Sequence, residues 1–164
     1  MREYTHFTRE CLFEELKPAM VTAMRAFIQQ HTALLQDSES NALTCIETET
    51  VQTRIGFVER LSGLSEKVHY TGALLTPQCV IWATSGPQRK TSVLAARLVD
   101  IEITRLDYTG VRDPGLDLFG QLVDGKERIQ VYIALGDDPA GQNFKRIFSA
   151  ALEKALLDSG PSQG

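Results

Sequence analysis

The chain has 164 residues, which suits one compact domain and is short for two. Hydrophobic residues make up 43% and charged residues 23%, so a disordered or low-complexity chain is excluded. The 17 basic and 21 acidic residues leave a net charge of -4 and form no block of like charge. We therefore expect no nucleic-acid partner, because such a partner selects a broad cationic face.

No apolar run reaches the roughly 18 residues of a membrane span, and residues 1–6 lack the apolar centre of a signal peptide. The expectation is a soluble, cytoplasmic protein without integral membrane association. Cys11, Cys45 and Cys79 follow one another at spacings of 34 residues, without a C-x-x-C pair or a His at ligand spacing. They are predicted to be reduced, small buried side chains, and the sequence indicates no metal site and no cofactor.

An amphipathic helix is predicted between Leu12 and Leu35, within an N-terminal helical segment at residues 1–41. Pro18 suits a first helical turn, so the regular helix should begin near Lys17, after a separate turn. The apolar stripe recurs every three or four residues and contains Phe13, Leu16, Met20, Met24, Phe27, Leu34 and Leu35. His31 lies at the centre of this stripe.

After the polar connector at residues 37–41 the apolar period changes from 3.6 to 2, which indicates a sheet. Seven strands are predicted, at residues 43–54, 67–75, 79–84, 89–95, 99–104, 116–123 and 127–135. The strand at 79–84 is apolar on both faces and should be central. The turns at residues 76–78 and 124–126 each predict a hairpin.

A final amphipathic helix is predicted after Asp137-Asp138-Pro139, which supplies a cap and a proline at the first helical position. Its apolar stripe should cover the sheet, and it contains Phe144, Ile147, Phe148, Ala151, Leu152 and Ala155. Residues 42–158 are thus predicted to form one strand-rich domain packed with the N-terminal segment, and residues 159–164 a frayed tail.

So many antiparallel strands must curl or close, and a terminal helix can plug an open barrel end. The stretch from Tyr70 to Ala83 resembles the "gxLxlTxxRLiw" hairpin of bacterial pleckstrin-homology-like and GRAM-like domains. Residues 98–102 are similar to the "l.dI" step that follows it, and residues 115–136 to the last hairpin. The resemblance implies an α+β fold with a seven-stranded curled antiparallel barrel and a C-terminal capping helix.

The resemblance also implies a binding or assembly scaffold and, for some relatives, a phosphoinositide or other lipid headgroup ligand. Such relatives gather cations around the loop between the first two strands, because several phosphates need converging positive charge. Here Glu59 and Glu66 dilute that charge, so we expect negligible lipid binding. The candidate cations on the two loops are Arg54, Arg60, Lys67, Arg89 and Lys90.

Catalysis is not predicted. His6, His31 and His69 stand beside no recognisable nucleophile motif. The carboxylate pair at 137–138 is explained by a helix cap, and the pair at 47 and 49 by an exposed strand face.

The remaining class is a protein-interaction or self-assembly module. In such a module the apolar stripe of the N-terminal helix must be buried against another surface. That surface is either the chain's own sheet or another subunit of a homo-oligomer. The candidate interface residues are Met20, Met24, Phe27 and His31. The alternative is a cystatin-like or nuclear-transport-factor-like cone, with a small-molecule pocket lined by His69, Tyr70 and Trp82. The C-terminal helix distinguishes the two, because such cones usually end on a strand.

Overall fold

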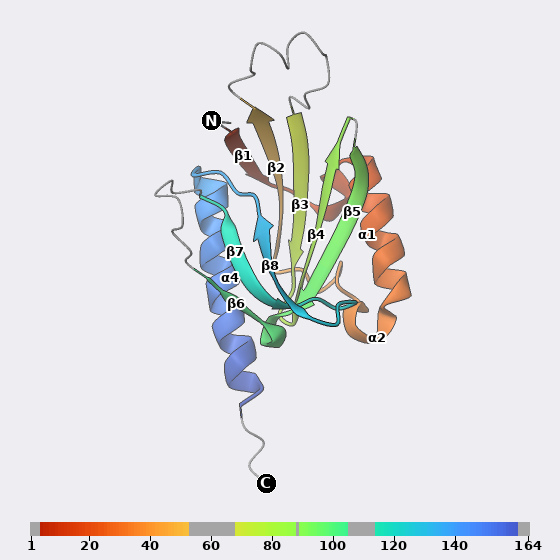
Figure 1. Ribbon diagram of the computed structural model, residues 1–164, viewed down its shortest axis with the longest axis vertical. Helices are drawn as coiled ribbons and strands as arrows, with labels where there is room; N and C mark the ends of the chain where they lie inside the picture. The colour runs from red at the N-terminus through yellow and green to blue at the C-terminus, as the bar shows by residue number, and fades with distance from the viewer. Residues whose placement is uncertain (1–3, 53–67, 88, 105–113, 161–164) are drawn as a thin grey trace.

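The computed structural model describes residues 4–52, 68–87, 89–104 and 114–160, and there the protein is α+β. Its strands form two antiparallel sheets, one ordered β1-β2-β3-β4-β5 and one ordered β6-β7-β8 (Figure 1). The strands are β1 (Tyr4–Glu10), β2 (Thr44–Gln52), β3 (Val68–Leu75), β4 (Cys79–Gly86), β5 (Arg89–Arg97), β6 (Ile101–Ile103), β7 (Leu116–Gln121) and β8 (Arg128–Ile133). The helices are η1 (Phe13–Glu15), α1 (Pro18–Gln30), α2 (Thr32–Leu35), η2 (Leu98–Asp100) and α4 (Pro139–Asp158).

The two separate sheets correct the predicted seven-stranded curled barrel. Eight strands are described, and the additional one is β1, in the segment for which only a helix was predicted. β1 pairs with β2 along its whole length, from Tyr4↔Gln52 to Glu10↔Ile46. Its sequence YTHFTRE contains only two large apolar side chains, so it has no alternation strong enough to predict a strand.

The N-terminal helix begins as predicted. The separate turn is η1, and α1 then starts at Pro18, where the missing N–H of proline costs no helical hydrogen bond. α1 ends at Gln30, and after His31 the chain forms the four-residue helix α2. The predicted stretch is therefore helical in two pieces.

Both predicted hairpins are confirmed. β3 and β4 pair around a turn in which Thr76 Oγ1 accepts hydrogen bonds from the backbone N–H groups of Gln78 and Cys79, at 3.2 and 3.0 Å. β7 and β8 pair from Leu116↔Ile133 to Gln121↔Arg128. The strand predicted at 99–104 is shorter, because η2 takes its first residues.

The closing helix is also confirmed. Asp138 caps α4, since its Oδ1 accepts a hydrogen bond from the Gly141 N–H at 3.1 Å, and Pro139 occupies the first turn. Two side chains of α4, Phe144 and Phe148, are fully buried. In Figure 1, α4 runs along one side of the molecule and its C-terminal turns extend beyond the sheets.

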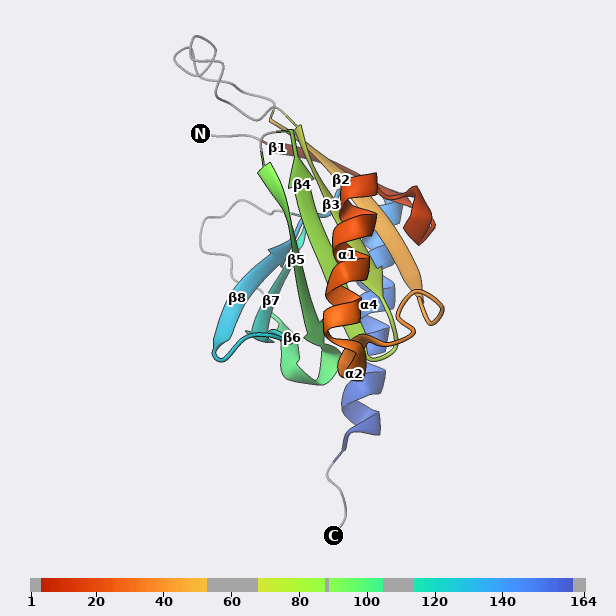
Figure 2. The same cartoon turned by 90° about the vertical axis from the view of Figure 1, so that its right-hand side faces the viewer.

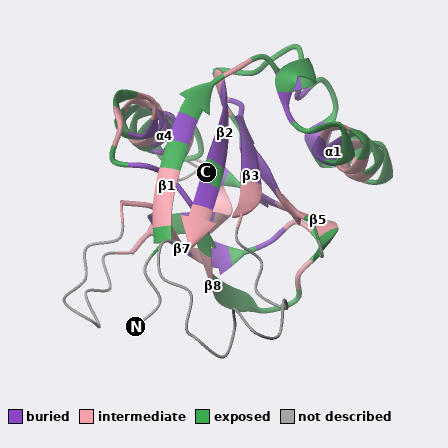
Figure 3. Ribbon diagram, turned by 90° about the horizontal axis from the view of Figure 1, so that it is seen from above, coloured by how far each residue is buried: buried purple, intermediate pink, exposed green. Residues whose placement is uncertain are grey.

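The central part of the five-stranded sheet is buried on both faces, whereas most of β1 is exposed. One face meets β6–β8 and α4 in an inner core, and the other meets η1 and α1 in an outer core (Figure 2). Along β4, Val80 and Trp82 belong to the inner core and Ile81 and Ala83 to the outer core, as expected of a central strand. Seen from above, the strands that carry many buried residues, β2 among them, lie between α1 and α4 (Figure 3).

Glycine permits the close approach of η1 and α1 to this sheet. A Cβ at Gly72 would lie 3.1 Å from Leu16 Cδ2 and 3.3 Å from Met20 Cε, tighter than ordinary van der Waals contact. The side chains of Leu16 and Met20 therefore pack directly against the backbone of β3 at Gly72.

Candidate functional site

The predicted anionic-ligand loops are only partly described. Arg54, Arg60 and Lys67 lie outside the described residues. Arg89 and Lys90 are both exposed and begin β5. The β4–β5 pairing shifts register beside them, between Thr84 and Gly86, and neither cation lies in a buried site.

Hydroxyl groups occupy the same end of the β4–β5 hairpin. Thr84 Oγ1 lies 3.0 Å from Ser92 Oγ, and Thr91 Oγ1 donates to Ser85 Oγ at 3.1 Å. These hydroxyls bond one another across the two strands. Their contacts tie the hairpin together.

We expect negligible co-sedimentation of the full chain with vesicles that contain phosphatidylserine or a phosphoinositide. The reason is that exposed cations at the end of a strand act as surface charges, which contribute little binding energy in salt. Vesicle pelleting at low and physiological ionic strength measures it. Strong, salt-sensitive binding that Arg89→Glu abolishes would contradict the expectation.

The candidate interface helix packs on its own chain. Met20 and Met24 have no exposed surface and belong to the outer core, where α1 contacts β4 and β5. Phe27 and His31 are half-buried, with ring centroids 4.4 Å apart. Of the two arrangements that the sequence left open, the structure has the one within the chain.

The three residues of the pocket alternative do not line a common space. Trp82 is 2% exposed and belongs to the inner core. Tyr70 packs against the outer core, with Lys17 Nζ 4.4 Å from its ring centroid. His69 faces Tyr4 in an edge-on ring contact and pairs with Thr50 of β2. The chain also ends its fold on a helix, the feature that distinguishes it from the cone.

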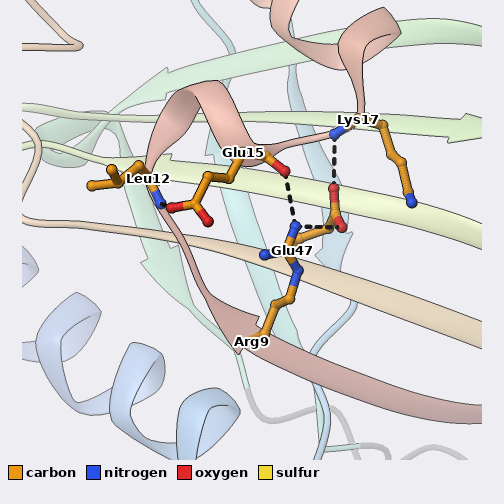
Figure 4. Close-up of polar contacts among 5 residues, drawn as sticks. All are labelled: Arg9, Leu12, Glu15, Lys17 and Glu47. Atoms are coloured by element: carbon orange, nitrogen blue, oxygen red, sulfur yellow. Dashed lines mark hydrogen bonds and ion pairs between the residues drawn. The ribbon is translucent and has the colours of Figure 1, made fainter.

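A buried carboxylate joins four N-terminal elements on the outer face (Figure 4). The Glu47 side chain is 6% exposed, and its Oε1 accepts from Arg9 Nη2 at 3.1 Å while its Oε2 accepts from the Lys17 N–H at 2.9 Å. Arg9 Nη2 also donates to the Glu15 carbonyl oxygen at 2.8 Å. Its bond to Glu47 raises the pKa of the Arg9 guanidinium. Glu47 is thus a structural anchor for β1, η1 and the start of α1, and not the exposed strand residue that the sequence suggested.

Two of the three cysteines meet beside this anchor. The ladder of β1 on β2 pairs Glu10 with Ile46, so the next facing pair is Cys11 and Cys45. The Cys11 N–H donates to the Cys45 carbonyl oxygen at 3.1 Å, and the Cys45 side chain lowers the pKa of the Cys11 thiol. Cys79 lies elsewhere in the outer core, 3.6 Å from the Leu34 carbonyl oxygen. The linear spacing of 34 residues contains no signal for the pair, because it depends on the unpredicted strand β1.

Two of the outer strands, β1 and β8, differ in how their edges are covered. At β1, Thr8 N–H donates to Asp138 Oδ2 at 2.7 Å, and Gly136 N–H donates to Thr8 Oγ1 at 2.8 Å, so the segment before α4 covers this edge. β8 pairs with β7, and no second strand of the described ranges joins it. Ile129 and Tyr132 on β8 are 41% and 38% exposed. At this edge, backbone hydrogen-bonding groups of β8 therefore lie beside the exposed side chains of Ile129 and Tyr132.

Comparisons of the chain with protein-family models, with curated proteins and with solved structures found no match. Across the described ranges, no helix has the length and hydropathy to cross a bilayer. In the same part of the chain, no three His, Cys, Asp or Glu side chains are grouped as metal ligands would be.

Proposed function

We propose that the chain is a non-catalytic interaction module of the pleckstrin-homology-like type that associates with a second copy of itself through the edge of β8. The order of elements supports the class: four consecutive antiparallel strands, β2 to β5, are followed by three more, β6 to β8, and by a helix over the inner core. In this proposal β1 and α1 are additions: β1 extends the first sheet at its edge, and α1 covers the outer face.

The observation that carries the proposal is the pattern along β8. Ile129 and Val131 lie on the face toward the inner core, while Arg128, Gln130 and Tyr132 lie on the opposite face. Alternate backbone N–H and C=O groups of this strand point away from β7. Such an edge can extend its sheet by pairing with another strand.

The sequence of β8 is complementary to itself in the antiparallel direction. When two copies pair about a two-fold axis at Gln130, Arg128 of each lies opposite Tyr132 of the other, and Ile129 lies opposite Val131. These are cation–aromatic and apolar cross-strand pairs, each of which stabilises a ladder. The symmetry is isologous, so the assembly closes as a dimer of two three-stranded sheets joined edge to edge.

Light scattering on the full chain tests the association, and we expect a mass that approaches twice 18.2 kDa as concentration rises. Gln130→Lys places two lysines directly opposite each other across the axis and should weaken dimerisation about fivefold, from ~1 kcal/mol of like-charge repulsion. Gln29→Lys, the same change at an exposed position of α1, is the matched control and should leave the mass unchanged. A constant mass of 18.2 kDa at every concentration would overturn self-association.

A further inference from the structure

We propose that Cys11 and Cys45 form a reversible redox site, in which a hydroperoxide oxidises the two thiols to an intrachain disulfide that fastens the end of β1 to β2. This site is independent of the β8 edge and goes beyond the proposed interaction function.

The backbone places the two cysteines opposite each other, as a disulfide between neighbouring strands requires. Cys11 follows β1 directly and continues its register on β2, and the Cys11 N–H bonds the Cys45 carbonyl oxygen. Facing residues of this hydrogen-bonded kind have Cα atoms about 5.5 Å apart. That separation falls within the range of disulfides, roughly 4.4 to 6.8 Å. Facing residues of a ladder also project to the same side of the sheet, so the two side chains lie on the same face.

The two cysteines have different surroundings, which gives them different roles. Cys45 is buried in the outer core, whereas Cys11 is partly exposed beside it. The hydrogen bond from the Cys45 thiol lowers the pKa of Cys11, and the positive charge of Arg9 acts in the same direction. The same hydrogen bond, together with burial, raises the pKa of Cys45. Cys11 is therefore the thiolate that meets the oxidant, and Cys45 is the resolving thiol.

The reaction balances with one equivalent of hydrogen peroxide. The Cys11 thiolate attacks one peroxide oxygen, the O–O bond breaks, and the departing hydroxide takes a proton to leave as water. Cys11 is now a sulfenic acid. The Cys45 sulfur attacks the Cys11 sulfur, the S–O bond breaks, and the Cys45 proton leaves with the hydroxyl group as a second water. Two thiols have lost two electrons, and exchange with an external dithiol restores them.

The test treats the folded full chain with hydrogen peroxide, removes the oxidant, and counts thiols after denaturation. We expect the three thiols of the reduced chain to fall to one, with a mass lower by two hydrogen atoms and one peptide pair joined through residues 11 and 45. Dithiothreitol should return all three thiols. The expected product is a monomer by non-reducing electrophoresis.

Matched variants locate the chemistry. Cys79→Ser should still form the disulfide, so its two thiols fall to none, whereas Cys11→Ser should lose no thiols to an intrachain bond. Cys11 is partly exposed, so this variant should fold, and near-ultraviolet circular dichroism of Trp82 confirms that it has. Disulfides that involve Cys79, crosslinks only between chains, or irreversible oxidation of Cys11 without a disulfide would each overturn the proposal.

Alkylation kinetics add a pH signature. A lowered pKa means that Cys11 is more fully deprotonated at neutral pH than an ordinary cysteine, whose pKa is about 8.5. The rate at which Cys11 reacts with iodoacetamide should therefore reach half its maximum at a pH below about 8.5. Cys45→Ala removes the hydrogen bond and should move the midpoint upward. A Cys11 midpoint at or above that of an ordinary cysteine in the folded chain would contradict the assigned roles.

Discussion

A chain shortened to begin at Asn41 is expected to lose its cooperative fold. The shortening removes β1, η1, α1 and α2, and with them five large side chains that are nearly or fully buried in the outer core: Phe13, Leu16, Met20, Met24 and Leu35. Burial of one such side chain contributes roughly 1.5 to 3 kcal/mol, so the five together contribute on the order of 10 kcal/mol. That is comparable to the whole free energy of unfolding of a domain, about 5 to 15 kcal/mol.

The sheet that remains would also be damaged at its edge. β2 would lose its partner strand, and the buried carboxylate of Glu47 would lose both Arg9 and the Lys17 N–H. Leu74 and Ile81 would face water on the side that α1 now covers. Aggregation is therefore a second expected result.

Near-ultraviolet circular dichroism of Trp82 and light scattering measure this outcome. The shortened chain should lose the Trp82 signal or aggregate, while a control chain that ends at Gly160 should keep the signal of the full chain. A shortened chain that is a folded monomer would show that the N-terminal segment is dispensable. In that case the candidate interface residues of the helix would again be expected to contact another subunit. They are Met20, Met24, Phe27 and His31.

Replacing Arg9 by methionine is expected to lower the free energy of unfolding by about 3 kcal/mol, because Glu47 would then be buried without its cation. The Arg9 side chain is half exposed, so water can partly replace it beside the Glu47 carboxylate. The loss of unfolding free energy should therefore lie at the lower end of the range for broken buried ion pairs. Urea unfolding at neutral pH, followed by Trp82 fluorescence, measures the change.

A double-mutant cycle separates the charge from the packing. In a Glu47→Gln background the Arg9→Met change should cost only about 1 kcal/mol, because no buried charge is stranded. Arg25→Met is the matched control: Arg25 pairs with Glu39 at 2.8 Å, but both side chains are exposed, so its loss should be much smaller. Equal losses from Arg9→Met and Arg25→Met would show that Glu47 has no special role in the fold.

Local signals made several elements predictable from the sequence. Pro18 marks the start of α1, Asp138 and Pro139 mark the start of α4, and the turns at 76–78 and 124–126 mark two hairpins. Each of these depends on proline geometry, a capping side chain or a turn within a few residues. The two-faced burial of β4 was predictable for a similar reason, since a run of four apolar residues cannot have a wet face.

The sequence by itself thus determined an α+β chain in which two long helices begin, and two hairpins turn, at recognisable residues. Only the tertiary structure decided that β1 is a strand, that α1 packs on its own sheet, and that the sheets stay separate. It also brought Arg9 to Glu47, 38 residues away, and Cys11 to Cys45. The physical reason is the register of β1 on β2, in which residues far apart in the chain face each other across the ladder, and no short stretch of sequence contains that pairing.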